Sequence, residues 1–497
     1  MVEINKLLVA NRGEIALRVM RSAREMGIST VAVYSEADRH ALHTRFADEA
    51  ICIGPAASAD SYLRIDKILE ACQRTQADAI HPGYGFLSEN AEFARRVREA
   101  GITFVGPSPE AIEVMGSKLA AKAAVSQFEV PLVPGTDDPV HDVESARQAA
   151  ARIGYPVLIK ASAGGGGKGM RIVASDGELA EQMERAISEA TSAFGDGSVF
   201  IEKYITGPKH IEIQILGDQQ GNHVFLFERE CSIQRRYQKV IEEAPSPSVS
   251  EDTRRAMGEA AVQVAKACNY VGAGTVEFVM GQNQRFYFLE MNTRLQVEHP
   301  VTEMITGLDL VQEQLRIAQG EALSVKQDQL QIRGHALEVR VYAEDPANNF
   351  LPDTGTLATY RRPQGPGVRV DDGFEEGMDI PIYYDPMIAK LIVHAGTRDQ
   401  AIRRMVRAID EYQISGVATT LAFCRFVLTH PAFLSGEFTT KFVEEHFSPE
   451  ALSEPVNEET EEAVVLLATH LLEKHVAPSS PRATTGQGSA WTKRRWQ

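Results

Sequence analysis

Two apolar segments near the middle of the chain, TVEFVM and RFYFLEMNTR, each carry one acidic residue. Both segments are typical of strands, and the GQNQ between them predicts a hairpin. If the turn is centred between Asn283 and Gln284, Glu277 faces Glu290, and their Cβ atoms lie about 4.5–5.5 Å apart. Mg²⁺ prefers one or two carboxylates together with substrate phosphates. Asn292 follows on the same face, so these three residues predict a site for Mg²⁺ or Mn²⁺. The alternative is a solvated polar face.

A run of glycines, AGGGGKG, stands between two predicted strands, PVLIKA and MRIVAS. Glycine lets backbone N–H groups approach phosphate oxygens closely, and the lysine adds a positive charge. A P-loop requires Ser or Thr after its lysine and then a helix, so this run is not one. We predict a flap over a nucleotide, and a mobile turn without a ligand is the alternative. The flap residues are Gly165, Gly166, Gly167, Lys168, Gly169 and Met170.

The strand that carries the second acidic residue continues with a polar residue at every second position. These residues are Glu290, Asn292, Arg294, Gln296 and Glu298. If the segment stays extended, they line one face that is roughly 26 Å long. One small ligand cannot contact all of that face, so its two ends would serve adjacent groups unless the chain bends. A phosphate-transfer site beside a small oxyanion site fits this pattern.

A similar alternation follows later in the chain, at Glu338, Arg340, Tyr342 and Glu344. An arginine directed inward from such a strand could stabilise a developing anion. A salt-bridged sheet arginine is the open alternative. Isolated basic residues indicate little by themselves, because most lysines are solvated surface groups. Three of these are Lys118, Lys160 and His210.

The elements that position these residues begin with alternating strands and helices. KLLVA, STVAVYS, ADAIHPG and ITFVG read as strands, and the helices are predicted at 14–27, 61–75 and 89–101. This alternation predicts a parallel, doubly wound sheet. A dinucleotide-binding domain would need GxGxxG after its first strand, and the chain has NRGE there. Later segments such as KHIEIQILGD and HVFLFERE predict antiparallel strands, so the fold class is α/β together with α+β.

Composition and charge exclude several classes of protein. The chain has 497 residues and a formal net charge of -17, from 68 acidic and 51 basic residues. A nucleic-acid binder would carry a basic footprint, so we expect no nucleic-acid partner. Five scattered cysteines without a CxxC pair indicate a reducing compartment and no zinc site. No leader segment and no apolar run of membrane-spanning length is evident, so we expect a cytoplasmic protein without a membrane partner.

Six motifs together resemble the biotin carboxylases of the ATP-grasp superfamily, over roughly residues 4–447. They are VANRGEIALR, HPGYGFLSEN, KASAGGGGKGM, QRRYQK, IEEAPS and EMNTRLQVEHPVTE. The last motif is highly specific, whereas the flap alone would fit many ATP-grasp enzymes. The resemblance implies a Rossmann-like N-terminal domain (1–114) and an ATP-grasp domain (115–330) with a mobile lid (about 131–204). It also implies a C-terminal biotin carboxylase domain (331–447), and an acidic segment with a flexible tail occupies 448–497.

The resemblance also implies roles for individual residues. Nucleotide contacts besides the flap would come from Lys118, Lys160, Glu202, Lys203, His210, Gln234, Tyr237, Glu277 and Glu290. The metal ligands would be Glu277, Glu290 and Asn292. Bicarbonate and biotin would be bound by Tyr84, Lys239, Arg294, Gln296, Val297, Glu298 and Arg340. Among these, Glu298 resembles the general base and Arg340 the group that holds the biotin enolate. One position departs from the family pattern, because Tyr237 stands where many members carry His or Asn.

The implied activity is the carboxylation of biotin with ATP and bicarbonate through carboxyphosphate. This is the first half-reaction of an acyl-CoA carboxylase such as acetyl-CoA carboxylase in fatty acid biosynthesis. The AMKM signature of a biotin carrier is not in the sequence, so we expect biotin on a separate carrier protein. A carboxyltransferase subunit and a homodimer are the other expected partners. The alternatives are another ATP-grasp ligase, a subunit of a pyruvate, propionyl- or methylcrotonyl-CoA carboxylase, or a non-catalytic scaffold.

Overall fold

The structure is a computed structural model that describes residues 2–136, 138–161, 170–194, 198–452 and 465–470. The chain divides into two units, Met1–Pro449 and Glu450–Gln497. In the second unit the described residues include one short exposed helix, at 465–470. The predicted flap lies outside the described residues. Among the described residues, no helix combines the length and apolar character that crossing a bilayer requires.

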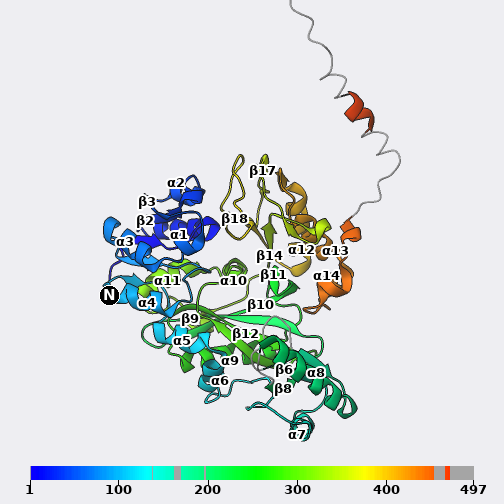
Figure 1. The fold of residues 1–497 in the computed structure, drawn as a ribbon. Coiled ribbons are helices and arrows are strands. Elements are labelled where there is room, and N and C mark those ends of the chain that lie inside the picture. The colour runs from blue at the N-terminus through cyan, green and yellow to red at the C-terminus, as the bar shows by residue number, and fades with distance from the viewer. Residues whose placement is uncertain (1, 137, 162–169, 195–197, 453–464, 471–497) are drawn as a thin grey trace, which may run out of the picture. The chain divides into compact units, whose positions relative to one another are not determined.

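The N-terminal part of the first unit is a parallel sheet with helices, as the strand–helix alternation predicts (Figure 1). Its strand order is β3-β2-β1-β4-β5. The strands are β1 (Lys6–Val9), β2 (Ser29–Ser35), β3 (Glu49–Gly54), β4 (Ala79–His81) and β5 (Thr103–Phe104). The helices are α1 (Gly13–Glu25), α2 (Leu42–Phe46), α3 (Ile65–Thr75), α4 (Ala91–Glu99) and α5 (Pro109–Gly116). Helix α3 begins four residues later than the predicted helix at 61–75.

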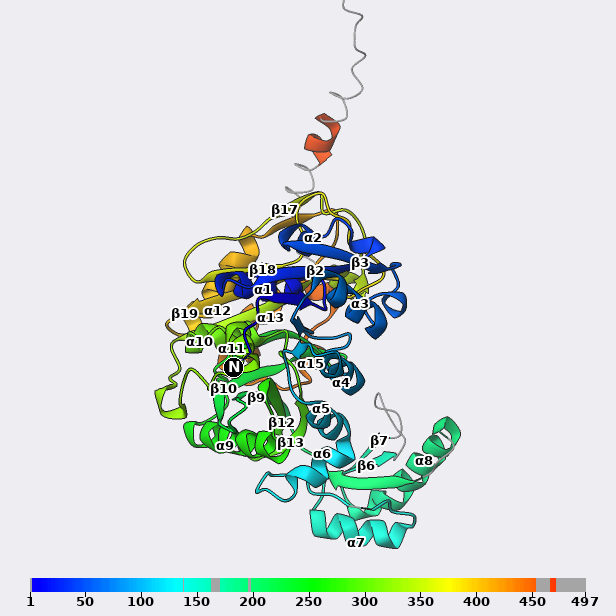
Figure 2. The ribbon, with the colours of Figure 1, turned by 90° about the vertical axis from the view of Figure 1, so that its left-hand side faces the viewer.

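A small three-stranded sheet, ordered β7-β6-β8, carries two helices on the segment predicted to be the lid (Figure 2). Its strands are β6 (Val157–Ala161), β7 (Met170–Val173) and β8 (Val199–Lys203). The helices of this segment are α7 (Val143–Ile153) and α8 (Asp176–Phe194), and α6 (Lys118–Val125) precedes it. Helices α7 and α8 pack on this sheet through a separate hydrophobic core, which includes Ala146, Ile159 and Leu179.

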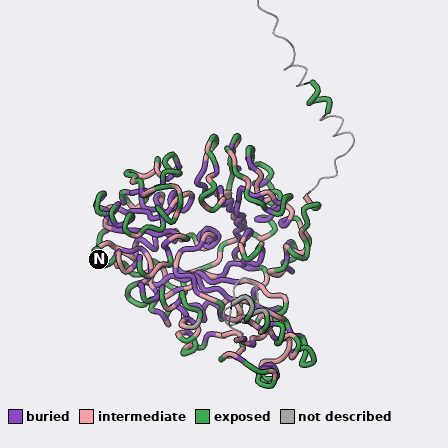
Figure 3. Tube along the Cα trace, viewed as in Figure 1, coloured by how far each residue is buried: buried purple, intermediate pink, exposed green. Residues whose placement is uncertain are grey.

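An eight-stranded antiparallel sheet forms the centre of the unit, in the order β13-β12-β9-β10-β11-β14-β19-β18. The strands are β9 (Lys209–Gly217), β10 (His223–Arg235), β11 (Gln238–Ala244), β12 (Gly272–Met280), β13 (Phe286–Asn292), β14 (His335–Tyr342), β18 (Val368–Asp372) and β19 (Met387–Ala395). Buried residues follow these strands across the sheet (Figure 3). Because β11 pairs with β14, this sheet crosses the boundary expected at 330.

Helices pack on the central sheet along its length. Helix α9 (Glu251–Ala267) packs against β9 and β10, and α10 (His299–Thr306) packs against β10, β11, β14 and β19. Helix α11 (Leu310–Ala318) packs against β12, and α12 (Arg398–Glu411) packs against β14 and β19. The remaining elements are β15 (Glu344–Asp345), β16 (Leu351–Pro352), β17 (Thr359–Arg361), β20 (Gln413–Ser415), α13 (Leu421–Thr429), α14 (Pro431–Ser435) and α15 (Phe442–His446).

Candidate active site

Three glutamates lie side by side on neighbouring strands of the central sheet. Glu212 on β9 pairs in register with Glu277 on β12, which pairs in register with Glu290 on β13. The predicted opposition of Glu277 and Glu290 is confirmed, but the predicted turn centre is wrong. Phe278 pairs with Phe288, so the hairpin turns around Asn283, and a one-residue bulge restores the pairing of the two glutamates.

One lysine from β11 binds three carboxylates at this point. Lys239 Nζ lies 2.5 Å from Glu212 Oε2, 3.0 Å from Glu277 Oε1 and 2.7 Å from Glu298 Oε1. Burial opposes its positive charge, but the three carboxylates outweigh burial and raise the pKa of Lys239 well above its usual range. The family resemblance assigns Lys239 to the bicarbonate pocket. The structure places it against Glu212 and Glu277 of the row formed by Glu212, Glu277 and Glu290, which is called the acidic row below.

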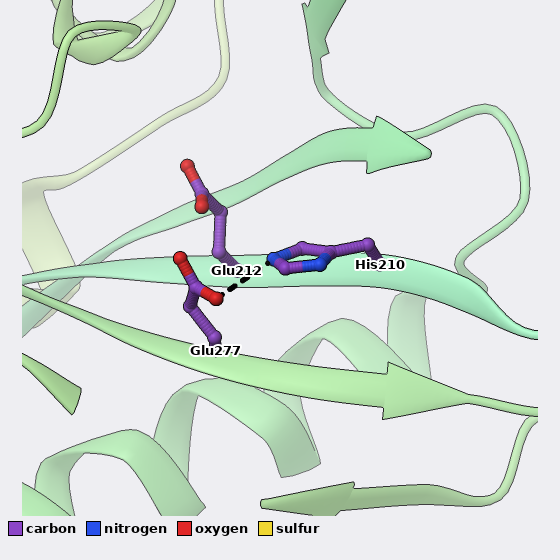
Figure 4. Close-up of side chains that lie close together, drawn as sticks. All are labelled: His210, Glu212 and Glu277. Carbon is purple, nitrogen blue, oxygen red and sulfur yellow. Dashed lines mark ion pairs between the residues drawn. The ribbon is translucent and has the colours of Figure 1, made fainter. Parts of the chain in front are cut away.

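The acidic row can hold a divalent cation. His210, Glu212 and Glu277 offer ligand atoms that all lie within 4.8 Å of one another, and His210 Nε2 is 3.0 Å from Glu277 Oε2 (Figure 4). Glu277 Oε1 also accepts hydrogen bonds from Asn292 and Gln296, each at 2.9 Å. Carboxylate and amide oxygens are the donors that Mg²⁺ prefers, so these residues fit this ion.

The side chain of Glu290 is half-buried beside this row. Burial raises its pKa, and the charge of Glu277 raises it further. For Glu277 itself, burial is outweighed by Lys239 and His210, which hold its pKa far below the usual range. A divalent cation would relieve the repulsion between these two carboxylates.

Glu298 and Arg340 form an ion pair next to the acidic row, to which Lys239 connects Glu298. Arg340 Nη2 donates to Glu298 Oε2 at 2.8 Å, and both side chains are buried. Burial would raise the pKa of Glu298, but Lys239 and Arg340 hold it well below its usual value. The predicted alternative, a sheet arginine in a salt bridge, describes the observed contact equally well.

Of the two alternatives for residues 290–298, an extended polar face or a bent chain, the structure shows the bend. Strand β13 ends at Asn292, and Glu298 is the residue that precedes helix α10. The chain bends between them, so that Gln296 reaches back to Glu277 and Arg294 Nη2 donates to Asn292 Oδ1 at 3.0 Å. Two predicted metal ligands, Glu277 and Asn292, therefore contact Gln296 and Arg294 of the predicted bicarbonate pocket directly.

Arg229 is a central residue that sequence reasoning missed. It is fully buried and donates to Glu212, Gln214, Thr275, Gln296 and Thr302 at 2.5–3.0 Å. It thereby connects β9, β10, β12, the bend before α10 and α10 itself. The alternation of His210, Glu212 and Gln214 on β9 is a signal that could have indicated a polar face here.

Three other predicted nucleotide residues, Lys160, Glu202 and Lys203, lie on the small sheet. Lys160 on β6 forms an ion pair with Glu202 on β8, and Lys122 Nζ lies 3.4 Å from the same carboxylate. Lys203 donates to the carbonyl oxygens of Gly154 and Tyr155 at 2.7 and 2.9 Å, so its ammonium group binds backbone in this arrangement.

Three further predicted nucleotide residues come from different elements. Lys118 is exposed at the first position of α6. Gln234 Nε2 donates to the carbonyl oxygen of Cys231 at 2.8 Å. Tyr237 is 79% exposed on the two-residue turn between β10 and β11, where it and Arg236 both have positive φ. The side chain of Met170 and the flap glycines lie outside the description.

A cavity of about 460 Å³ opens beside Arg340. Val297, Tyr84 and Glu14 also line it, together with aromatic residues of the loop before β19. Tyr84 donates a hydrogen bond to Glu14, and Lys390 Nζ donates to the carbonyl oxygen of Val297 at 2.9 Å. The structure thus brings four of the predicted substrate residues, Glu298 included, to one place at or next to an aromatic cavity.

Three families match successive parts of the chain. Residues 3–112 match "Biotin carboxylase, N-terminal domain", residues 117–326 match "Carbamoyl-phosphate synthase L chain, ATP binding domain", and residues 338–445 match "Biotin carboxylase C-terminal domain". The first and third matches name the same enzyme on both sides of the ATP-binding segment.

Whole-chain relatives agree with these matches. Biotin carboxylase 1 of Bacillus subtilis is 54% identical over 442 residues, which cover 89% of this chain and 98% of the relative. The human mitochondrial propionyl-CoA carboxylase alpha chain is 54% identical over 88% of this chain and 61% of its own length.

Among solved structures, the biotin carboxylase domain dimer of Hydrogenobacter thermophilus 2-oxoglutarate carboxylase has a TM-score of 0.80 and 48% identity. That match covers 91% of this chain and 100% of the other, which is described as a complex with MgADP, ADP and bicarbonate. The identity, the coverage and the fold lead to one conclusion: the chain belongs to the biotin carboxylase family.

Proposed function

We propose that this protein carboxylates biotin with ATP and bicarbonate, through carboxyphosphate. The observation that carries this proposal is the arrangement of Lys239, Glu298 and Arg340 next to the acidic row. A carboxylate between two cations beside a metal-type site suits a reaction that joins a small oxyanion to a phosphoryl group. Membership of the biotin carboxylase family supports the same reaction.

The chain divides its work between the predicted domains at 1–114, 115–330 and 331–447. Glu277, Glu290 and Asn292 would hold Mg²⁺, which would neutralise charge on the ATP phosphates. The nucleotide would contact Lys118, Lys160, Glu202, Lys203, His210, Gln234, Tyr237 and the flap. Bicarbonate would lie between Lys239, Arg294 and Gln296, where the bend before α10 collects cationic and amide groups.

The chemistry requires one proton to leave bicarbonate and one to leave biotin. Glu298 accepts the bicarbonate proton, and the resulting oxyanion attacks the γ-phosphorus, giving carboxyphosphate and ADP. Carboxyphosphate then separates into CO₂ and phosphate inside the site. The phosphate takes the ureido proton of biotin, and Arg340 stabilises the enolate while it attacks CO₂. The cavity that Arg340, Val297 and Tyr84 line is where the biotin ring would enter.

The partners follow from this chemistry. Because biotin must be delivered and then removed, a biotin carrier protein and a carboxyltransferase subunit would be the partners, in the cytoplasm. The human relative is named an alpha chain, and the Hydrogenobacter structure is titled a dimer, which supports subunit partners and a homodimer. Acetyl-CoA carboxylase is one possible complex. Relatives named for propionyl-CoA, methylcrotonoyl-CoA and pyruvate support others.

The test is an ATP-cleavage assay with bicarbonate, with and without free biotin. Wild-type protein should cleave ATP in a bicarbonate-dependent way and form carboxybiotin. Glu298→Gln should lose this cleavage, by roughly 10²- to 10⁴-fold as expected for a lost general base, while it still binds ATP in a calorimetric titration. Full activity of the variant would remove Glu298 from the reaction. Turnover that ignores biotin would favour another ATP-grasp ligase instead.

A further inference from the structure

The guanidinium group of Arg340 is held at two edges by two different glutamates. Nη2 donates to Glu298 Oε2 at 2.8 Å, and Nε donates to Glu242 Oε1 at 2.7 Å. The third nitrogen, Nη1, makes only a long 3.5 Å contact with the hydroxyl of Tyr342, which also lines the cavity. One edge of the arginine is therefore bound to the proposed base and the other to a residue without a role in the proposed chemistry.

The two glutamates belong to different kinds of element. Glu298 lies at the bend that precedes α10, whereas Glu242 lies within β11, a strand paired on both sides in the central sheet. The register of β10 and β11 shifts by one residue at Val240, which lets Lys239 and Glu242 serve the same site. Glu242 is fully buried, so its position depends on the sheet rather than on solvent.

The proposed chemistry weakens one of these two contacts. When Glu298 accepts the bicarbonate proton, it loses its charge, and a neutral acid binds a guanidinium less strongly than a carboxylate does. Arg340 must stay aligned at that moment, because its next task is to stabilise the enolate. Burial raises the pKa of Glu242 to about 7, and the negative charge of Glu298 adds to this rise. When Glu298 is protonated this second cause is lost, which favours the carboxylate form of Glu242 beside Nε.

We propose that Glu242 is a positioning residue for biotin carboxylation, which holds the Nε edge of Arg340 while Nη2 turns from Glu298 to the substrate. This inference rests on the proposed function, since it assigns Glu242 a task between its two half-steps. Glu242 touches no reacting atom, and it acts only through the orientation of Arg340. Its loss should therefore uncouple ATP cleavage from carboxybiotin formation rather than stop both.

A neighbouring glutamate provides a matched control. Glu338 pairs in register with Glu242 across β11 and β14, and it is also fully buried. Within the described part of the chain, neither of its carboxyl oxygens has a hydrogen-bond partner. Burial raises the pKa of Glu338 well above its usual range, which favours its neutral form. An amide should replace it without changing the charge of the site.

The experiment compares Glu242→Gln with Glu338→Gln in the full-length protein. Two rates are measured on each: ATP cleavage with bicarbonate alone, and carboxybiotin formed per ATP cleaved when free biotin is present. We expect Glu242→Gln to lower the carboxybiotin yield per ATP by roughly tenfold, as for a misaligned catalytic group. Glu338→Gln should keep the wild-type yield. An unchanged yield in Glu242→Gln, or an equal loss in both variants, would overturn the proposal.

A second pair of variants covers the case in which Glu242→Gln does not fold. Glu242→Asp keeps the charge but withdraws it by one methylene group, and Glu338→Asp makes the same change in the control position. We expect a lower yield per ATP in Glu242→Asp than in Glu338→Asp, and equal yields would contradict the proposal. If wild-type protein forms no carboxybiotin at all, the proposed function fails first, which is a different result from either of these.

Discussion

Two lysine–glutamate pairs contribute to the proposed reaction, and they are held in different ways. Lys239 and Glu298 lie in the central sheet and at its adjoining bend, with side chains 12% and 2% exposed. Lys160 and Glu202 lie on the small sheet, with side chains 37% and 16% exposed. The central pair is fixed by further charged partners, whereas the outer pair can exchange its partner for a phosphate with little desolvation. In the proposed reaction, the proton-transfer group would thus be held in place before substrate binds, whereas the nucleotide contacts would adjust on binding.

The largest difference between the two pairs is expected when Lys239, the lysine of the central pair, is replaced. Lys239→Met leaves three buried carboxylates without the cation that they share, and removing one partner of a buried ion pair costs about 3–5 kcal/mol. We expect a large fall in the midpoint of thermal unfolding, together with loss of bicarbonate-dependent ATP cleavage. A midpoint equal to that of the wild type would show that the three carboxylates do not depend on Lys239.

The pH dependence of stability sharpens the comparison, because the central sheet also buries a carboxyl group, that of Glu338, whose pKa lies well above its usual range. The folded pKa of Glu338 lies above its unfolded value, so its contribution is fully present below the unfolded pKa and falls as the pH rises. Glu338→Gln removes this term. The unfolding free energy of the variant minus that of the wild type should therefore increase with pH. The increase is about 1.4 kcal/mol per pH unit between the unfolded and the folded pKa of Glu338.

Denaturant unfolding of both proteins at pH 5 and pH 7 would measure this difference. A gap between the variant and the wild type that stays constant with pH would contradict a neutral Glu338.

The smallest effect on stability is expected at the outer pair. Lys160→Met removes a half-exposed ion pair, and such pairs contribute about 0–1 kcal/mol. The KM for ATP should rise roughly tenfold, which corresponds to about 1.4 kcal/mol of lost binding, and the unfolding midpoint should stay close to the wild type. If Lys160→Met destabilised the protein as strongly as Lys239→Met, the distinction between the two pairs would be lost.

The local pattern predicted those parts of the site that depend on neighbours in sequence. Period-two alternation and a short connection were enough to place Glu277 opposite Glu290, and strand–helix alternation was enough for the parallel sheet. The exact turn was misplaced, because a bulge near Leu289 cannot be seen in the alternation of apolar residues. The flap and the tail beyond 470 stay predictions.

The remaining parts of the site depend on contacts between distant segments. Arg229, Glu242 and Lys390 were not singled out, because the sequence of a strand does not show which of its charged residues meet distant partners. Their partners, such as Gln296 for Arg229 and Val297 for Lys390, lie 67 and 93 positions away. The bend after Asn292 was left open as an alternative, since the alternating residues there also fit an extended strand. The family resemblance, rather than the pattern, supplied the roles of Lys239 and Glu298.

The shared edge between β11 and β14 limits how this protein could be dissected by truncation. A shortened protein that stopped at 330 would retain Glu242 and Glu298 but lose Arg340, the residue that both bind. It would also leave the backbone of β11 open along one side, and an open strand of this kind pairs readily with other chains. We therefore expect the ATP-binding segment to aggregate when it is produced without the strands that follow it.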